Sequence, residues 1–71
     1  MGIIKLLDVV ALTEDLPGHS LRRGQVGTVV ELLKPGFFEV EFNDNEGRAY
    51  ATLPLRPDQL MVLHDSLISV P

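Results

Sequence analysis

The clearest pattern of apolar and polar positions lies between residues 21 and 42, LRRGQVGTVVELLKPGFFEVEF. Phe37–Phe42 alternates strictly, with large apolar residues at positions 38, 40 and 42 and glutamates at 39 and 41, which is typical of a strand buried on one face. Gln25–Leu33 is rich in β-branched residues and predicts a second strand. Lys34-Pro35-Gly36 between them is typical of a turn. The stretch therefore predicts a β-hairpin around which the rest of the chain is organised.

The apolar positions also predict how the two strands of this hairpin pair. A slip of one residue would turn every side chain to the other face, so the buried set specifies the register. With a three-residue connection, Leu32 faces Phe38, Val30 faces Val40 and Thr28 faces Phe42. A two-residue connection would instead bury Glu31 opposite Val40, and an unpaired buried carboxylate costs several kcal/mol. We therefore predict the three-residue connection.

Weaker apolar runs and turn formers predict the remaining elements. They are a strand at Asp8–Leu12 within the apolar run Ile3–Leu12, a loop at Thr13–Ser20, a strand at Arg48–Leu53, a 3₁₀ turn at Arg56–Gln59 and a closing strand at Leu60–Leu63. Pro54 has no N–H for a ladder, so we expect it to end the fourth strand. Gly27, inside the second strand, is expected to mark a bulge or a sharp bend.

A four-residue connection, Asp44-Asn45-Glu46-Gly47, joins the third and fourth strands in this interpretation. It places Phe42 opposite Ala49, Val40 opposite Ala51, Phe38 opposite Leu53 and Tyr50 opposite Glu41. Five antiparallel strands with a one-turn interruption predict an all-β, SH3-like barrel over residues 1–64. Two interpretations of the tail, residues 65–71, stay open: Leu67, Ile68 and Val70 pack on a sheet edge or on another subunit, or the tail frays.

Composition limits the function classes. The chain has 71 residues, which is enough for one small domain, and no cysteine, which excludes disulfides and thiolate metal sites. The net charge is −4 with six Lys and Arg residues, which argues against nucleic acid or another acidic partner and is compatible with a basic one. The N-terminal apolar run is interrupted by Lys5 and Asp8, so we interpret it as a strand rather than a signal peptide. We expect a cytoplasmic protein with no membrane association.

No combination of residues predicts catalysis, a metal or a cofactor. Asp44 and Glu46 share a turn but lack the ligand pattern of a calcium loop. His19 and His64 are 45 positions apart and show no metal-binding spacing. No serine has the context of a nucleophile, and the glycines do not form a phosphate-binding motif. We therefore expect a protein that is not an enzyme.

The predicted register brings several side chains together on the outer face of the sheet. These are Glu31, Glu39 and Glu41 with Phe37 and Tyr50. One interpretation is an ordinary solvated face with a few exposed apolar residues. The other is a docking surface for a basic protein, with Phe37 and Tyr50 as the apolar anchors.

Two long stretches carry a resemblance, DVVALTEDLPGHSLRRGQVGTVVELL and FFEVEFNDNEGRAYATLPLRPDQL. Together they resemble a family of small bacterial proteins, domain of unknown function 4926, whose pattern has a DVV strand, a TEDLP loop, an RGxVGTVV core, a YEVEF-like strand and a closing DQL. Phe38 stands where that pattern has tyrosine. The resemblance covers Ile3 to Leu63 and implies a compact SH3-like barrel with no assigned activity.

The segment GQVGTV also resembles the KOW element of ribosomal and elongation proteins, whose basic loops bind RNA. Here acidic residues follow the glycines, which argues against that function. We expect a non-catalytic protein-binding or accessory module that modulates an enzyme or neutralises a toxin-like protein. The alternatives are a nucleic-acid-binding barrel that uses Arg22, Arg23 and Lys34, and a structural subunit that self-assembles through the tail.

Overall fold

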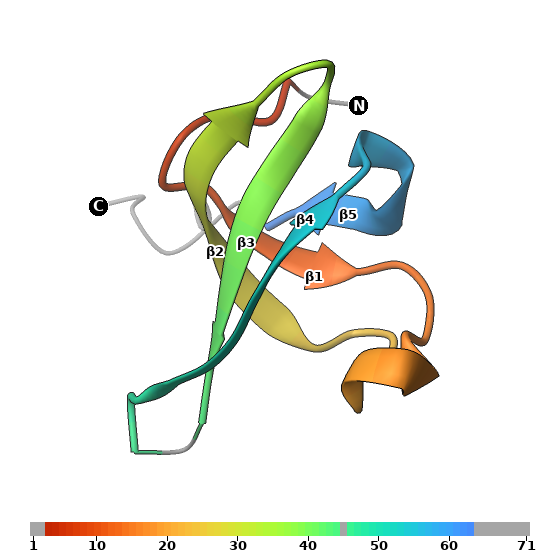
Figure 1. Cartoon of the computed structure of the whole chain (residues 1–71), viewed down its shortest axis with the longest axis vertical. Helices are drawn as coiled ribbons and strands as arrows, with labels where there is room; N and C mark the ends of the chain where they lie inside the picture. The colour runs from red at the N-terminus through yellow and green to blue at the C-terminus, as the bar shows by residue number, and fades with distance from the viewer. Residues whose placement is uncertain (1–2, 45, 64–71) are drawn as a thin grey trace, which may run out of the picture.

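The computed structural model describes residues 3–44 and 46–63. They form one antiparallel sheet with the strand order β4-β3-β2-β1-β5 (Figure 1). The elements are β1 (Val9–Leu12), the 3₁₀ turn η1 (Pro17–His19), β2 (Val26–Leu33), β3 (Phe37–Asn43), β4 (Ala49–Leu55), the 3₁₀ turn η2 (Pro57–Gln59) and β5 (Leu60–Val62). The prediction of an all-β fold with five strands and a 3₁₀ turn before the last strand is confirmed.

The sheet curls around its core but does not close into a barrel. Its two edges are β4 and β5, which do not pair with each other. β3 and β4 cross in front of β1 and β5 in Figure 1, and β2 pairs with both β1 and β3 and so connects the two layers. Between these layers lie the buried residues Val10, Leu12, Leu21, Val29, Val40, Phe42, Leu53, Leu55 and Leu60. Every strand contributes to this core.

The β2–β3 hairpin has the predicted three-residue connection. Leu33 pairs with Phe37, Leu32 with Phe38 and Glu31 with Glu39. Beyond these pairs a β-bulge at Val30 changes the register, so the predictions of Val30 opposite Val40 and Thr28 opposite Phe42 are wrong. Val40 pairs with Val29 instead, and Phe42 pairs with Gly27. Two adjacent valines fit either register, so the apolar pattern could not reveal the extra residue.

Gly27 gives Phe42 the space that it occupies. A Cβ at position 27 would lie 2.8 Å from the Glu41 carbonyl oxygen, 2.8 Å from Val40 Cγ1 and 2.9 Å from Phe42 Cδ1. Phe42 itself is completely buried. Of the bulge or sharp bend expected at Gly27, the bulge lies three residues later, at Val30. Gly27 itself is required for close packing between β2 and β3.

The β3–β4 pairing differs from the prediction by two residues. Asn43 pairs with Ala49, so the connection has five residues and the predicted four-residue connection is wrong. A bulge that leaves Tyr50 without a ladder partner adds the second residue of the shift, and Phe42 pairs with Ala51, Val40 with Leu53 and Phe38 with Leu55. A shift of two keeps every residue on its face, so alternation could not distinguish the two registers. Pro54 does not end the strand but pairs with Glu39. An edge strand accommodates a proline because one side of its backbone has no neighbouring strand.

We predict that Gly27→Ala destabilises the fold by about 1–3 kcal/mol, because the methyl group overpacks the contact with Phe42. The free energy of unfolding, measured by urea denaturation followed by circular dichroism, tests this. Gly18→Ala is the matched control, because a Cβ there meets no atom within 4 Å. Equal stabilities of the two variants would contradict the packing role of Gly27.

Candidate protein-docking surface

Three carboxylates lie on the outer face of β2 and β3. Glu31 and Glu39 are directly opposite each other in the ladder, and Glu41 is the next outward residue of β3. We call these three residues the acidic strip. Glu31 is exposed, while Glu39 and Glu41 are half-buried. The prediction that Glu31 faces Glu39 is confirmed.

No cation of the described residues neutralises the acidic strip. The ion pairs found within residues 3–44 and 46–63 involve Arg48 and Arg56, whose partners lie in turns rather than on the strip. Like charges that face each other across a ladder destabilise a sheet modestly. The strip therefore presents a negative potential to solvent, and that potential attracts cationic groups.

Phe37 lies at one end of the acidic strip. It precedes Glu39 by two positions in β3, so the two side chains share the outer face. Phe37 is 36% exposed as a residue, and its ladder partner Leu33 is half-buried. The structure thus places an apolar contact beside the carboxylates, as the sequence predicted.

Tyr50 does not lie beside Phe37 and the acidic strip. The prediction that it faces Glu41 is wrong, because Glu41 pairs with Thr52. The Tyr50 hydroxyl oxygen accepts a hydrogen bond from Gln25 Nε2 at 2.7 Å and lies 3.5 Å from the carbonyl oxygen of Ser20. Its place near Asn43 is five or six strand positions from Phe37, about 17–20 Å along β3. Phe37 and the neighbourhood of Tyr50 therefore lie at opposite ends of β3.

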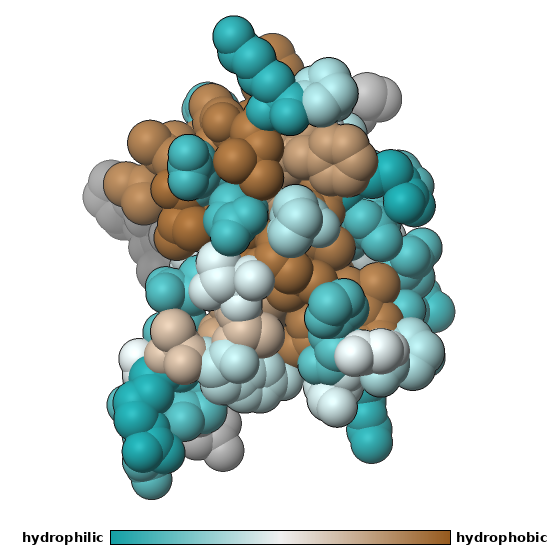
Figure 2. Space-filling view, viewed as in Figure 1, coloured by the Kyte–Doolittle hydropathy of each residue, from teal (hydrophilic) through white to brown (hydrophobic). Residues whose placement is uncertain are grey.

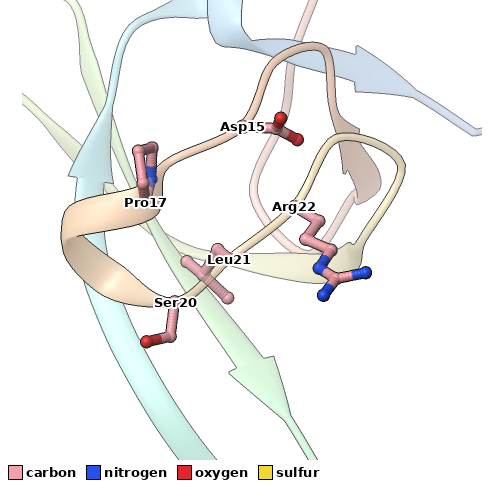
Figure 3. Close-up of a pocket in the computed structure, with 5 residues that line it drawn as sticks. All are labelled: Asp15, Pro17, Ser20, Leu21 and Arg22. Atoms are coloured by element: carbon pink, nitrogen blue, oxygen red, sulfur yellow. The ribbon is translucent and has the colours of Figure 1, made fainter.

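The loop before β2 forms a pocket that the sequence analysis missed (Figure 3). The backbones of Leu16 and Leu21 hydrogen-bond to each other in both directions, at 2.9 and 3.2 Å, and Leu21 is buried. The pocket has a volume of about 380 Å³ and is lined by Asp15, Pro17, Ser20, Leu21 and Arg22. No motif marks it, because the pocket depends on the contact between the two arms of the loop.

The basic residues considered for nucleic acid do not form one patch. Arg22 lines the loop pocket before β2, whereas Lys34 lies in the turn after it. The eight residues of β2 separate them by about 26 Å. Asp15 Oδ1 accepts a hydrogen bond from the Arg23 backbone N–H at 2.8 Å, which adds a carboxylate to the surroundings of the loop arginines.

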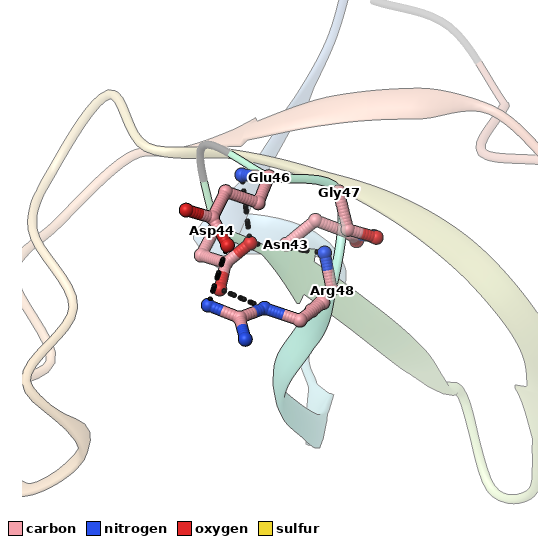
Figure 4. A network of polar contacts seen from close by, with 5 residues as sticks. All are labelled: Asn43, Asp44, Glu46, Gly47 and Arg48. Atoms are coloured by element: carbon pink, nitrogen blue, oxygen red, sulfur yellow. Dashed lines mark hydrogen bonds and ion pairs between the residues drawn. The ribbon is translucent and has the colours of Figure 1, made fainter.

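The carboxylates of the β3–β4 turn are engaged in the turn itself (Figure 4). Asp44 Oδ1 accepts hydrogen bonds from the backbone N–H groups of Glu46 and Arg48, both at 2.9 Å. The Arg48 guanidinium lies 3.1 Å from Asp44 Oδ2 and 2.9 Å from Glu46 Oε1. These contacts stabilise the turn. Within the described part of the chain, no group of three or more His, Asp or Glu residues could hold a metal ion.

One known protein family matches most of the chain. The family model described as Domain of unknown function (DUF4926) matches residues 6–62. The chain belongs to this family. The matched residues include all five strands, and the family description names no activity. No curated protein and no solved structure matches the chain. Among the described residues of this DUF4926 protein, no helix has the length and hydropathy to cross a membrane.

We predict that Asp44 makes stability depend on pH in the acid range. The Arg48 backbone N–H is the main cause that lowers the pKa of the Asp44 carboxyl below its usual 3.8. A lowered pKa contributes stability above the unfolded-state value, and this contribution is lost as pH falls through the folded-state value. Between about pH 4 and pH 2, the free energy of unfolding should fall less steeply for Asp44→Asn than for wild type.

Carboxyl carbon NMR titration of the wild-type protein tests the same assignment directly. The midpoint for Asp44 is expected below 3.8. A midpoint at or above that value would contradict the role of the backbone hydrogen bonds. Asparagine retains an oxygen acceptor for the two N–H groups, so the variant keeps the turn while removing the titration.

Proposed function

We propose that this protein is a non-catalytic binding module that docks a basic partner protein through the acidic strip, and that docking modulates or neutralises the partner. The observation that carries the proposal is the juxtaposition of Glu31, Glu39 and Glu41 on one outer face without a neutralising cation among the described residues. The absence of cysteine from the sequence agrees with a reducing compartment, and we propose a cytoplasmic protein.

Electrostatics support this function over the alternatives. A carboxylate strip on a chain of net charge −4 accelerates encounter with cationic surfaces and repels anionic ones such as nucleic acid. Lys or Arg side chains of the partner would neutralise the repulsion between Glu31 and Glu39. Phe37 would supply apolar contact at the end of the strip, where exposed aromatic residues are common anchors.

The other candidates have less support. The separation of Arg22 and Lys34 by the length of β2 removes the continuous basic surface that a nucleic-acid-binding barrel uses. The self-assembly hypothesis depends on Leu67, Ile68 and Val70, which lie outside the described residues. We therefore retain protein binding as the proposed function.

We predict that the Glu31→Gln, Glu39→Gln double variant loses capture of the partner by about tenfold or more, because two charged contacts disappear. The immobilised full chain is incubated with lysate of its own organism, and bound proteins are quantified by mass spectrometry. Capture should also weaken as salt rises. Glu46→Gln is the control, because it removes the same charge in the β3–β4 turn, away from the strip.

Thermal denaturation of each variant separates binding from folding. The double variant should be as stable as wild type or slightly more stable, because a like-charge pair is removed. Phe37→Ala and Tyr50→Ala are prepared separately, since the structure places these residues at opposite ends of the hairpin. Equal capture by wild type and the double variant, or a partner without a basic surface, would refute the proposed function.

A further inference from the structure

The outer surface of the sheet has two halves that meet at the β-bulge of β2. One half is the acidic strip. The other half consists of apolar side chains that are exposed by between 38% and 70%. We call these residues the apolar face: Leu7, Val9, Val26, Val30, Met61 and Leu63.

Backbone pairing makes the apolar face continuous. Ala11 of β1 pairs with Val26 on one side and with Met61 on the other. The Leu63 N–H donates to the Val9 carbonyl oxygen at 2.8 Å, which places Leu63 beside Val9. The outward positions of β1, of β5 and of the first half of β2 carry no ionisable side chain. This half of the surface is therefore unsuited to a purely ionic partner.

The segment before β1 extends the apolar face toward the acidic strip. The Leu7 N–H donates to the Val29 carbonyl oxygen at 2.7 Å, and the Val29 N–H donates to the Asp8 carbonyl oxygen at 2.9 Å. These bonds hold the backbone of Leu7 against Val29, the residue that precedes Val30. Figure 2 shows hydrophobic residues gathered at the upper left, where the N-terminal segment runs beside the end of β2 in Figure 1.

The bulge joins the two halves. Val29 and Glu31 pair with consecutive residues of β3, so the extra residue Val30 lies outward together with Glu31. Val30 and Glu39 lie on neighbouring strands, which are about 4.8 Å apart, and Leu7 lies in the turn that precedes β1 and hydrogen-bonds to Val29. An apolar row and a carboxylate row therefore lie within reach of one short peptide segment.

We propose that the apolar face and the acidic strip together bind one amphipathic basic segment of a partner protein. Apolar side chains of the segment cover Leu7 and Val30, and its Lys or Arg side chains pair with Glu31 and Glu39. This proposal rests on the proposed function and adds the apolar half, which defines the chemistry of the partner. A second copy fits less well, because its own acidic strip would be brought close to this one.

The test uses two labelled synthetic peptides and the full chain. One is an 18-residue amphipathic helix of Leu and Lys, and the other has each Leu replaced by Ser at the same charge. Fluorescence anisotropy at low salt should show the Leu/Lys peptide binding about tenfold more tightly, because its apolar face is buried. Glu31→Gln, Glu39→Gln should weaken binding of both peptides.

Leu7→Gly tests the apolar half. Its φ of 71° lies in the left-handed region, which glycine adopts without strain, so this variant should fold as well as wild type. It should weaken binding of the Leu/Lys peptide by about tenfold and leave the Ser/Lys peptide unchanged. Leu32→Ala is the control, because Leu32 is also exposed but pairs with Phe38, whose side chain points to the inner face.

The outcomes separate the two proposals. Equal affinities for both peptides, unchanged by Leu7→Gly but weakened by the glutamate substitutions, would overturn the apolar half and leave docking on the acidic strip intact. If the glutamate substitutions leave the affinity unchanged, or if neither peptide binds, both the proposed function and this further inference are overturned. Sedimentation equilibrium completes the test: a dimer that Leu7→Gly dissociates would assign the apolar face to a second copy and overturn the inference.

Discussion

The packing of Phe42 on the bare backbone of Gly27 is the contact on which the rest of the sheet depends. It fixes the pairing of β2 with β3 at one end of the hairpin, and the Lys34-Pro35-Gly36 turn fixes it at the other. From Gly27 to Leu33, β2 advances by six residues, whereas β3 advances by only five between their partners Phe42 and Phe37. The two strands can satisfy both constraints only if β2 accommodates one extra residue, and that residue is Val30. The bulge is therefore a consequence of core packing.

The same bulge shapes the outer surface. It moves Val29 into the core and leaves Val30 outside beside Glu31, so that an apolar row borders the acidic strip. The division of the surface into an apolar half and an acidic half thus arises from a constraint inside the molecule. A partner that binds this surface would gain affinity from hydrophobic burial, whereas charge complementarity would set its orientation and its rate of association.

The edges of the open sheet offer less to a partner than its face. Pro54 interrupts the hydrogen-bonding row of β4, and the bulge at Tyr50 bends the same strand. At the other edge, β5 is three residues long. Proline, bulges and short edge strands all oppose the addition of a foreign strand. These features direct recognition toward side chains on the outer face and away from backbone pairing.

The sequence by itself determined the five strands, the 3₁₀ turn before the last of them, the three-residue turn and the placement of Glu31 opposite Glu39. Strict alternation and turn-forming residues are local signals, so they specify the strand pairing only within a few residues of the turn. Only the tertiary structure decided the bulge at Val30, the two-residue shift of β4 and the contact of Tyr50 with Gln25. Neighbouring valines are chemically equivalent, and a shift of two preserves every face, so the apolar pattern allows both registers. Close packing between strands distinguishes them, because Phe42 fits against Gly27 and against no residue with a Cβ at that position.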